Sequence, residues 1–224
     1  MITIQEYTTK HPIQLIGEEA GICWGADTTD RDKNFKRGLN CLSSGHGRTF
    51  EFPDVYMIID GYSARVIREW YTHIGGSPTR LQASTRYIDY DDFDFVIPES
   101  IEKNPILKGI YVKTVDNIRQ GLVELRKQGA SKEDSAMLLP IGMKTKMVCK
   151  HNLRNLIDMS HQRMCQRAYK EYRDLFNDVA NALKDYSDEW RLIVDSYFEP
   201  KCKYLGHCPE KNGCGKFINK GDLK

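Results

Sequence analysis

The residues best suited to chemistry lie between Arg68 and Tyr87, in the segment REWYTHIGGSPTRLQASTRY. Its side chains that can donate hydrogen bonds to phosphate oxygens include Ser77, Ser84, Thr85 and Arg86. A guanidinium suits phosphate because its planar fork donates two parallel, charge-assisted hydrogen bonds. The segment therefore predicts an anion site. A surface loop without a ligand is the alternative, because loops rich in Ser, Thr and Gly are common.

A second group of charged side chains lies in a long apolar-periodic stretch. Apolar residues at steps of three and four predict one helix from Asn152 to about Asp185, the longest element and the core of the fold. Near its start, one face carries Arg154, Asp158 and His161, and another carries Arg163 and Arg167. The alternative to a functional site is a solvated face, on which Arg167 and Glu171 form an ordinary exposed ion pair.

The elements before the first segment must position it. Val55–Ile59 is a β-branched and aromatic run, which predicts a buried strand ended by a turn at Asp60-Gly61. Ser63 can then cap a helix from Ala64 to about His73, which Gly75-Gly76 would end. Because the loop follows a helix C-terminus, where the dipole disfavours anions, the arginines must supply most of the positive potential.

The remaining pattern predicts further helices and one more strand. A short helix is expected near Pro12–Ala20, before a polar stretch from Asp27 to Lys36. The acidic and aromatic segment IDYDDFDF is expected at the surface or at a subunit contact. Two helices joined by a tight turn are expected after it. The first covers Val115 to Gln128 and stops at Gly129, and the second is capped by Ser131 with Asp134 and broken at Leu138-Leu139-Pro140.

Met143 to Cys149 follows as a strand, with Lys144, Lys146 and Lys150 on one face. Together these elements predict an α+β domain whose sheet is crossed by long helices. The length of 224 residues suits one large domain, or one domain with an appendage.

Composition narrows the class of protein. The 33 basic and 31 acidic residues leave a net charge of +2, without the basic excess of a protein whose main partner is nucleic acid. The first residues lack a signal-peptide pattern and no apolar run approaches the length of a membrane span, which predicts a soluble cytoplasmic protein. The odd number of seven cysteines predicts reduced thiols.

Three cysteines in the tail, Cys202, Cys208 and Cys214, are spaced six residues apart with His207 between. Three thiolates and an imidazole make a zinc site possible in principle. The spacing lacks a CxxC knuckle, however, and His207 adjoins Cys208, so we expect no metal and a tail that packs against the domain.

Three ordered motifs resemble those of flavin-dependent thymidylate synthases. Arg68-Glu69-Trp70, His73, Ser77, Ser84, Arg86 and Tyr87 resemble the family's RHRxxSxNExSxRY signature and the helix end before it. The stretch from Asn152-Leu153-Arg154 through Arg163 to Ala168 and Glu171 resembles the NxRxLxxFxxLRxxxxAxxE helix, and Gly45-His46 with Phe50-Glu51 resembles GHxxxxEH. The resemblance spans residues 45 to 171.

The chain also departs from these motifs. Thr72 and Ile74 replace the two arginines of RHR, Leu81-Gln82 replaces Asn-Glu, and two residues are inserted between Ser77 and Ser84. Phe52 replaces the last His of GHxxxxEH, and Ala136 replaces an arginine that binds phosphate in many members. Arg80 and Arg48 are available to restore the lost charge from other positions.

The resemblance implies a reaction in which NADPH reduces bound FAD, methylenetetrahydrofolate supplies one carbon, and dUMP becomes dTMP without a cysteine nucleophile. It also implies a mostly antiparallel central sheet within a catalytic domain of residues 1–200, followed by a tail of residues 201–224, and a homotetramer with active sites shared between subunits.

Residue roles carry over position by position from the resemblance. Arg163 is the expected catalytic residue, at the uracil ring. The residues expected to bind dUMP, besides Arg163, are Glu69, Thr72, Gln82, Ser84, Thr85 and Arg86. The residues expected to bind FAD are Arg48, His73, Ile74, Gln82, Asn152, Arg154 and Asp158. For Asp158, simple pairing with Arg154 is an equal alternative, and for His46 a structural role is preferred over contact with folate or flavin.

Two alternatives to dUMP methylation stay open. In the first, the protein with its altered loop acts on a different pyrimidine. In the second, it has lost catalysis and binds a nucleotide, a nucleic acid or a protein. The near-neutral charge argues against the nucleic-acid version of the second alternative.

Overall fold

The computed structural model describes residues 1–222, which form two compact units. The first unit contains Met1–Ile58, His73–Arg80 and the chain from Val148 onward, and the second contains Ile59–Thr72 and Leu81–Met147. A four-stranded antiparallel sheet has the order β1-β2-β4-β3. Its strands are β1 (Ile2–Ile4), β2 (Asp54–Ser63), β3 (Thr79–Gln82) and β4 (Lys144–Asn152). The expected α+β class with a mostly antiparallel sheet is confirmed.

Strands β2 and β4 alternate as half-buried strands should. In β2, Val55, Met57 and Ile59 are fully buried. In β4, the buried side chains are Thr145, Met147, Cys149, His151 and the last residue, Asn152. The lysines predicted for the opposite face lie there. The predicted turn at Asp60-Gly61 is wrong, because β2 continues through both residues to Ser63.

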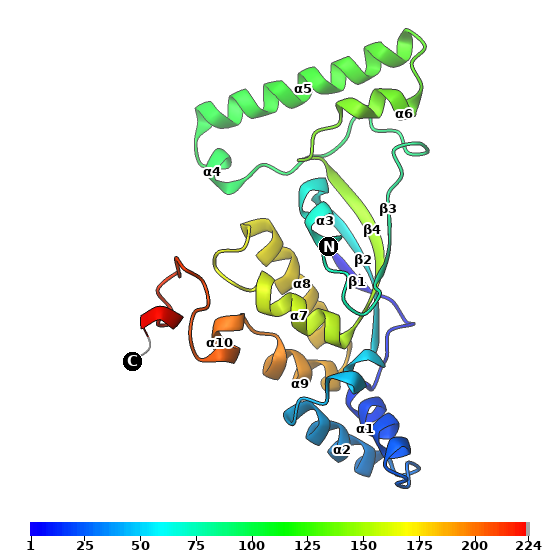
Figure 1. Ribbon diagram of the computed structural model, residues 1–224. Coiled ribbons are helices and arrows are strands. Elements are labelled where there is room, and N and C mark those ends of the chain that lie inside the picture. Colours follow the sequence, from blue (N-terminus) through cyan, green and yellow to red (C-terminus); the bar gives the residue numbers. More distant parts are fainter. Residues whose placement is uncertain (223–224) are drawn as a thin grey trace. The chain divides into compact units, whose positions relative to one another are not determined.

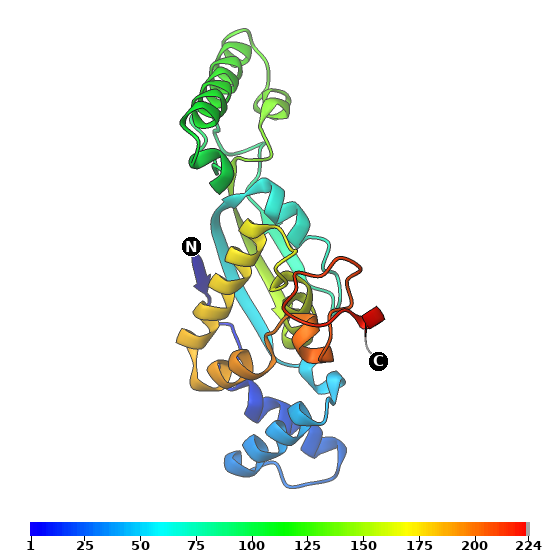
Figure 2. The ribbon, with the colours of Figure 1, turned by 90° about the vertical axis from the view of Figure 1, so that its left-hand side faces the viewer.

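The first unit is mostly helical. It contains α1 (Pro12–Cys23), α2 (Arg31–Ser43), α7 (Leu153–Arg163), α8 (Lys170–Tyr186), α9 (Asp188–Tyr197), α10 (Lys201–Leu205) and a short 3₁₀ helix, Gly47–Glu51. Helices α1 and α2 lie side by side (Figures 1 and 2). The stretch from Asp27 to Lys36, predicted only to be polar, is helical from Arg31, where α2 begins. Gly17 and Gly38 permit this approach, because a Cβ at either would lie under 2 Å from a carbonyl oxygen of the other helix.

Helix α8 packs against β1 and α9 and carries the apolar face of the unit. Its fully buried residues are Tyr172, Leu175, Phe176, Val179 and Leu183. The buried Glu189 of α9 accepts hydrogen bonds from the backbone N–H of Ile13 (2.7 Å) and Gln14 (3.1 Å). These groups have no partner within α1, so the carboxylate completes the N-terminus of that helix.

The single helix predicted from Asn152 to Asp185 is wrong. The chain leaves the helical path between Arg163, the last residue of α7, and Lys170, the first of α8. Arg173 bridges the break, because its guanidinium donates to the carbonyl oxygens of Gln166 and Ala168. Arg167 lies inside the break and pairs with Glu210 of the tail, so it does not face Glu171 across a helical turn as predicted.

The second unit contains α3 (Ala64–Trp70), α4 (Glu99–Glu102), α5 (Pro105–Lys127), α6 (Lys132–Ser135) and a 3₁₀ helix, Ala136–Leu138. Ser63 caps α3 and Ser131 caps α6, as predicted, each by accepting a bond from a backbone N–H three residues on. Helix α3 ends at Trp70, three residues earlier than predicted. Helix α5 has 23 residues and begins ten residues before the predicted Val115.

The acidic and aromatic segment is anchored on α5. Phe93 is buried with Val115, Leu122 and Met143. Arg126 pairs with Asp89 at 2.7 Å and with Asp91. The segment therefore forms part of the second unit's core, while its carboxylates lie nearer the surface.

Candidate functional site

His73 and Arg163, ninety residues apart in sequence, form a direct pair in the first unit. Arg163 lies at the end of α7, and its Nε donates a hydrogen bond to Nε2 of His73 at 2.9 Å. The guanidinium also lies over the ring of Tyr172, 4.3 Å from its centroid, and the His73 ring meets the same tyrosine edge to face. The aromatic ring and the acceptor nitrogen together fix the direction of the guanidinium.

The electrostatics of this pair keep His73 neutral. Burial, together with the positive charges of Arg163 and Arg80, lowers the pKa of His73 to about 4. Because Nε2 accepts the bond from Arg163, the ring proton of the neutral imidazole is on Nδ1. At neutral pH the arrangement therefore presents one fixed cation, Arg163, held by an uncharged acceptor.

The Gly-Gly turn after His73 is held by Asn152. The Asn152 side chain accepts a bond from the Asn155 N–H at 2.9 Å, which caps α7, and donates to the carbonyl oxygen of Gly76 at 3.4 Å. Gly76 has φ +72°, and a Cβ there would lie 2.4 Å from Asn152 Nδ2. Ser77 also has a positive φ, 51°, which is uncommon for a residue with a side chain.

Two further predicted FAD residues, Arg48 and Arg154, converge on Glu51. Arg154 contacts Glu51 Oε1 at 2.6 Å and Arg48 contacts Oε2 at 3.4 Å. No ion pair between Arg154 and Asp158 is found, because Arg154 turns to the 3₁₀ helix that precedes β2. Asp158 is exposed on α7, and Ile74 is 72% exposed although it is apolar.

The other predicted nucleotide residues lie in the second unit, around the ends of α3 and β3. Thr72 Oγ1 donates to the carbonyl oxygen of Glu69 at 2.7 Å, which closes the end of α3. Gln82 Nε2 donates to Thr145 Oγ1 of β4 at 3.4 Å. The exposed Arg86 pairs with Glu133 at 3.2 Å.

Ser84 shapes the turn that carries Thr85 and Arg86. Its Oγ accepts a bond from the Arg86 N–H at 3.2 Å, and its carbonyl oxygen accepts one from Ile88 N–H. The hydroxyl of Ser84 and the guanidinium of Arg86 therefore come from one short turn, as an anion site requires.

The structure thus brings together the first-unit residues in two groups. One contains His73 and Arg163, and the other Arg48 and Arg154. Tyr172 lies under the guanidinium of the first group and Glu51 joins the two arginines of the second, and sequence reasoning assigned neither of them a role in the site. Glu51 was named only as part of the GHxxxxEH resemblance and Arg80 only as a replacement for lost charge, whereas Tyr172 was only one residue of the predicted helix.

Arg80 lies beside His73 and brings positive charge to it. Its guanidinium donates to the carbonyl oxygen of His73 at 3.4 Å and contributes to the lowered pKa of both His73 and the buried His151. It lies in the lengthened part of the loop, between Ser77 and Ser84, and supplies positive charge beside His73, where Thr72 and Ile74 supply none.

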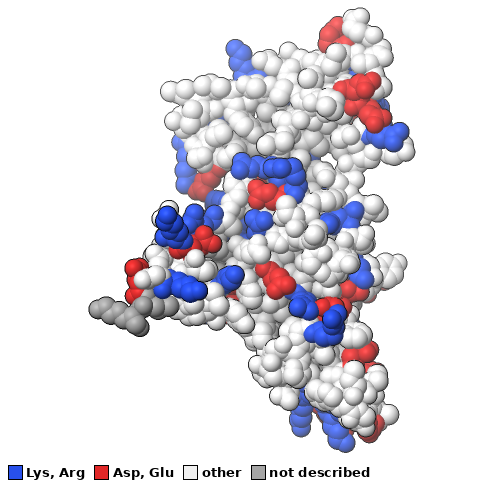
Figure 3. Space-filling model, in the orientation of Figure 1, with Lys and Arg blue, Asp and Glu red and all other residues white. Residues whose placement is uncertain are grey.

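His46, for which a structural role was preferred, is exposed and meets Trp24 edge to face at 6.1 Å. Within residues 1–222, no helix has the length and apolar character needed to cross a bilayer. Lysines and arginines are interspersed with acidic residues on the face shown in Figure 3.

The chain is similar to proteins of one family. The sequence model of the family described as "Thymidylate synthase complementing protein" matches residues 4–187. A protein named flavin-dependent thymidylate synthase from Thermococcus onnurineus is 31% identical, over 93% of this chain and 90% of that protein. One of the same name from Pyrococcus furiosus is 30% identical, over 98% of this chain and 95% of its own length.

Among solved structures, a crystal structure of thymidylate synthase X from Helicobacter pylori with FAD and dUMP superposes with a TM-score of 0.68. The alignment covers 87% of this chain and 99% of the other, at 18% identity. The two chains therefore share a fold.

Proposed function

Because the chain belongs to the family of flavin-dependent thymidylate synthases, we propose that it converts dUMP to dTMP, with methylenetetrahydrofolate as the carbon donor and FAD, reduced by NADPH, as the hydride carrier. The observation that carries the proposal is the family match across residues 4–187, which includes every proposed substrate and flavin residue. We take residues 1–200 as the catalytic part of the chain and 201–224 as an appendage.

The donor groups of the first unit fit FAD. Arg48 and Arg154 already meet at a single carboxylate, Glu51, so their guanidiniums can act together on another anion such as a diphosphate. His73 and Asn152 offer neutral groups, and Gly76 lets the backbone approach Asn152 closely. We assign Ile74 and Asp158 to the same site by their positions in the motifs. When bound, FAD supplies the hydride transfer, and the protein supplies orientation and electrostatics.

The second unit supplies the proposed groups for dUMP. The turn with Ser84, Thr85 and Arg86 offers two hydroxyls and a guanidinium for the phosphate. Gln82 would lie between nucleotide and flavin. Glu69 and Thr72 are assigned to the nucleotide by their positions at the end of α3.

Arg163 is the proposed catalytic residue. As negative charge builds on the N3–O2 edge of uracil during attack from C5, a fixed guanidinium there stabilises it. The contacts with His73 and Tyr172 hold the guanidinium in one direction before substrate binds. A neutral His73 suits this role, because a protonated imidazole would repel the arginine and lose the acceptor nitrogen.

A cysteine nucleophile has little support. The signature segment from Arg68 to Tyr87 contains no cysteine. Cys149 on β4 lies near Arg80, but burial raises the pKa of its thiol to about 12, so the reactive thiolate is scarce at neutral pH.

We further propose a homotetramer with shared active sites and a cytoplasmic location. In the proposed arrangement, Arg86 and Arg163 of one active site come from different chains, as the resemblance in the motifs implies. Reduced thiols, such as those of the buried Cys41 and Cys149, persist in the reducing conditions of the cytoplasm.

The test is the visible absorption spectrum of the purified protein with added FAD, followed by anaerobic reduction with NADPH. We expect bound flavin that is reoxidised only when both dUMP and methylenetetrahydrofolate are added, with dTMP as the product. A protein that takes up no FAD would overturn the proposal.

The substituted loop, with Thr72 and Ile74, favours one second candidate, a synthase for another pyrimidine. Parallel assays with dCMP and uridine-containing RNA distinguish it, because a product from RNA alone would exclude dUMP as substrate. A module that only binds polyanions is not favoured, given the family match and the mixed charges in Figure 3.

A further inference from the structure

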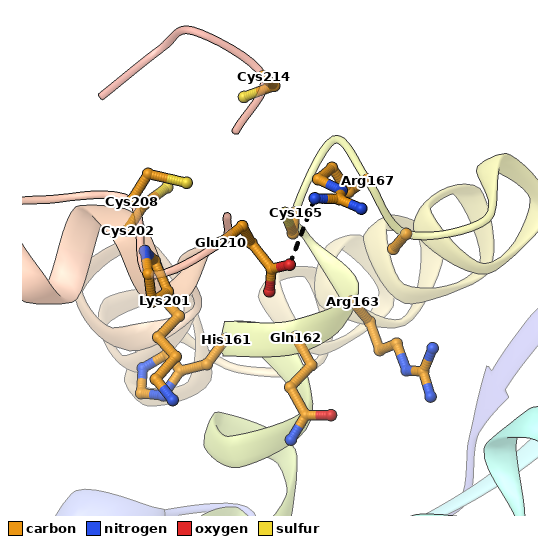
Figure 4. Close-up of a pocket in the computed structure, with 12 residues that line it drawn as sticks. His161, Gln162, Arg163, Cys165, Arg167, Lys201, Cys202, Cys208, Glu210 and Cys214 are labelled. Atoms are coloured by element: carbon orange, nitrogen blue, oxygen red, sulfur yellow. Dashed lines mark ion pairs between the residues drawn. The ribbon is translucent and has the colours of Figure 1, made fainter. Parts of the chain in front are cut away.

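Four of the seven cysteines line one pocket of the first unit, which Arg163 at the end of α7 also lines. The pocket has a volume of about 490 Å³ and lies between α7, the break that follows it, α10 and the tail. The cysteines that line it are Cys165, Cys202, Cys208 and Cys214. Figure 4 shows them on separate segments around the pocket. The other three cysteines lie elsewhere, on α1, α2 and β4.

The helix break places Cys165 in this group. In the predicted unbroken helix, Cys165 would be a packed helix residue, remote from the tail in sequence. The chain instead ends α7 at Arg163, and Cys165 then lines the pocket with Cys202 of α10. Helix α10 is held against α7 by stacking of Tyr204 on His161, with ring centroids 5.0 Å apart.

The tail closes into a loop that carries the other two cysteines. Cys208 N–H donates to the carbonyl oxygen of Ile218 at 2.8 Å, and Lys220 N–H donates to that of Cys208 at 2.9 Å, so the chain from 208 to 219 is a closed loop. Gly213 lets the loop pack on the thiol, because a Cβ there would lie 3.0 Å from Cys208 Sγ. Cys214 is the next residue.

Arg167 fastens this loop to the helix break. Its guanidinium donates to the carbonyl oxygen of Asn212 at 2.6 Å and pairs with Glu210 at 3.5 Å (Figure 4). Cys165 is two residues before Arg167, and Cys214 is two residues after Asn212, so the Arg167–Asn212 hydrogen bond brings their two segments together.

We propose that Cys165, Cys202, Cys208 and Cys214 bind one structural Zn²⁺ ion as a tetrathiolate site. Zinc prefers four sulfur ligands in a tetrahedron when its role is structural. Four thiols release four protons on binding, and the resulting site carries two net negative charges, which Arg167 and Lys201 at the pocket offset. His207 is not among the residues that line the pocket, so the fourth ligand is Cys165 and not the imidazole considered from sequence.

Binding requires the thiols to move inward. Within residues 1–222, no three His, Cys, Asp or Glu side chains are already arranged around a common metal position. Rotation of each thiol about its Cα–Cβ bond, with inward movement of the tail loop, is the change that zinc would drive. Such coupling between metal binding and local folding is typical of small zinc loops.

The test begins with the full-length protein purified without added zinc or chelator. We expect about one zinc per chain by elemental analysis, and X-ray absorption at the zinc edge that shows four sulfur neighbours at about 2.3 Å. This readout does not depend on FAD or on activity. Nitrogen or oxygen neighbours in place of sulfur, iron with sulfide in place of zinc, or no metal at all would overturn the proposal.

Single variants then identify the ligands. Cys165→Ser and Cys214→Ser are each expected to lower the zinc content at least tenfold after dialysis against a chelator, whereas Cys23→Ser, at an exposed position on α1, should retain it. A Cys165→Ser protein that keeps full zinc would contradict the assignment. So would a disulfide among the four cysteines, detected as missing thiols in the denatured wild-type protein.

Discussion

Gly76 allows a matched pair of substitutions that tests how the turn after His73 is held. Gly76→Ala introduces a Cβ 2.4 Å from Nδ2 and 2.8 Å from Oδ1 of Asn152, at a φ of +72°. Gly75→Ala introduces one that meets only Asn155 Nδ2, at 3.4 Å, and the φ of Gly75 is not in the left-handed region. The two changes are chemically identical and adjacent in sequence.

The expected cost of Gly76→Ala has two parts. A left-handed conformation costs a residue with a Cβ about 1–2 kcal/mol. The new methyl also displaces the Asn152 amide, which caps α7 through the Asn155 N–H, and loss of such a cap costs about 1 kcal/mol. We therefore expect Gly76→Ala to lower the free energy of unfolding by about 2–3 kcal/mol, and Gly75→Ala to change it by less than about 1 kcal/mol.

Urea unfolding followed by tryptophan fluorescence measures both values, and titration with FAD measures the effect on the proposed flavin site. FAD affinity should fall in Gly76→Ala and stay near that of the wild type in Gly75→Ala. Asn152→Ala removes the amide that the new methyl would displace. The double variant should therefore lose less free energy of unfolding than the sum of the losses in the two single variants. Equal destabilisation by the two glycine substitutions, or strict additivity with Asn152→Ala, would refute this account.

Two further predictions concern the paired residues and the shared site. The pKa of His73 is about 4 in the folded protein, against an ordinary value of 6.5. The unfolded chain therefore binds the proton first as pH falls. Between pH 6.5 and pH 4, His73 should lower the free energy of unfolding by about 1.4 kcal/mol for each pH unit of acidification. In His73→Gln, whose amide oxygen can still accept from Arg163, urea unfolding over this pH range should lack that part of the slope, and an unchanged slope would contradict the assignment. For the proposed tetramer, Arg86→Ala and Arg163→Ala should each be inactive alone. Co-expression of the two variants should restore part of the activity, because some mixed active sites then receive both arginines. No recovery in verified mixed tetramers would exclude sharing of these residues between chains.

Local signals predicted the local features of this fold. The caps at Ser63 and Ser131 and the alternation of β4 depend on neighbouring residues only, and all three are confirmed. The turn expected at Asp60-Gly61 failed because the strand has a partner far along the chain, and Lys146 of β4 pairs with Asp60 at 2.8 Å. Pairing across a sheet overrode the turn propensity of the two residues.

The break between α7 and α8 shows the same limit. The apolar seam continues from Leu153 to Leu183 without Gly or Pro, so sequence periodicity gives no reason to end a helix there. The carbonyl groups released by the break are bonded by Arg173, and Arg167 bonds to the tail 45 residues on. Only the tertiary contacts make the interruption stable.

The candidate site was reached mainly through the resemblance in its motifs. Those motifs named His73 and Arg163 separately, one for the flavin and one for uracil, whereas the structure joins them in one hydrogen bond. The role of Tyr172 under the guanidinium depends on the break that separates α7 from α8, and so it had no signal in the periodicity.

The contact between Arg167 and the tail also bears on what a truncated gene product would be. A chain that stopped after α9 would keep all of residues 4–187, and with them every residue of the family match. It would nevertheless lose the carbonyl of Asn212 and the carboxylate of Glu210, which hold the segment that begins just after Arg163. The matched region alone therefore lacks contacts that this protein uses. In a shortened chain, the segment just after α7, the helix that carries Arg163, would lose the contacts of Arg167 with the tail.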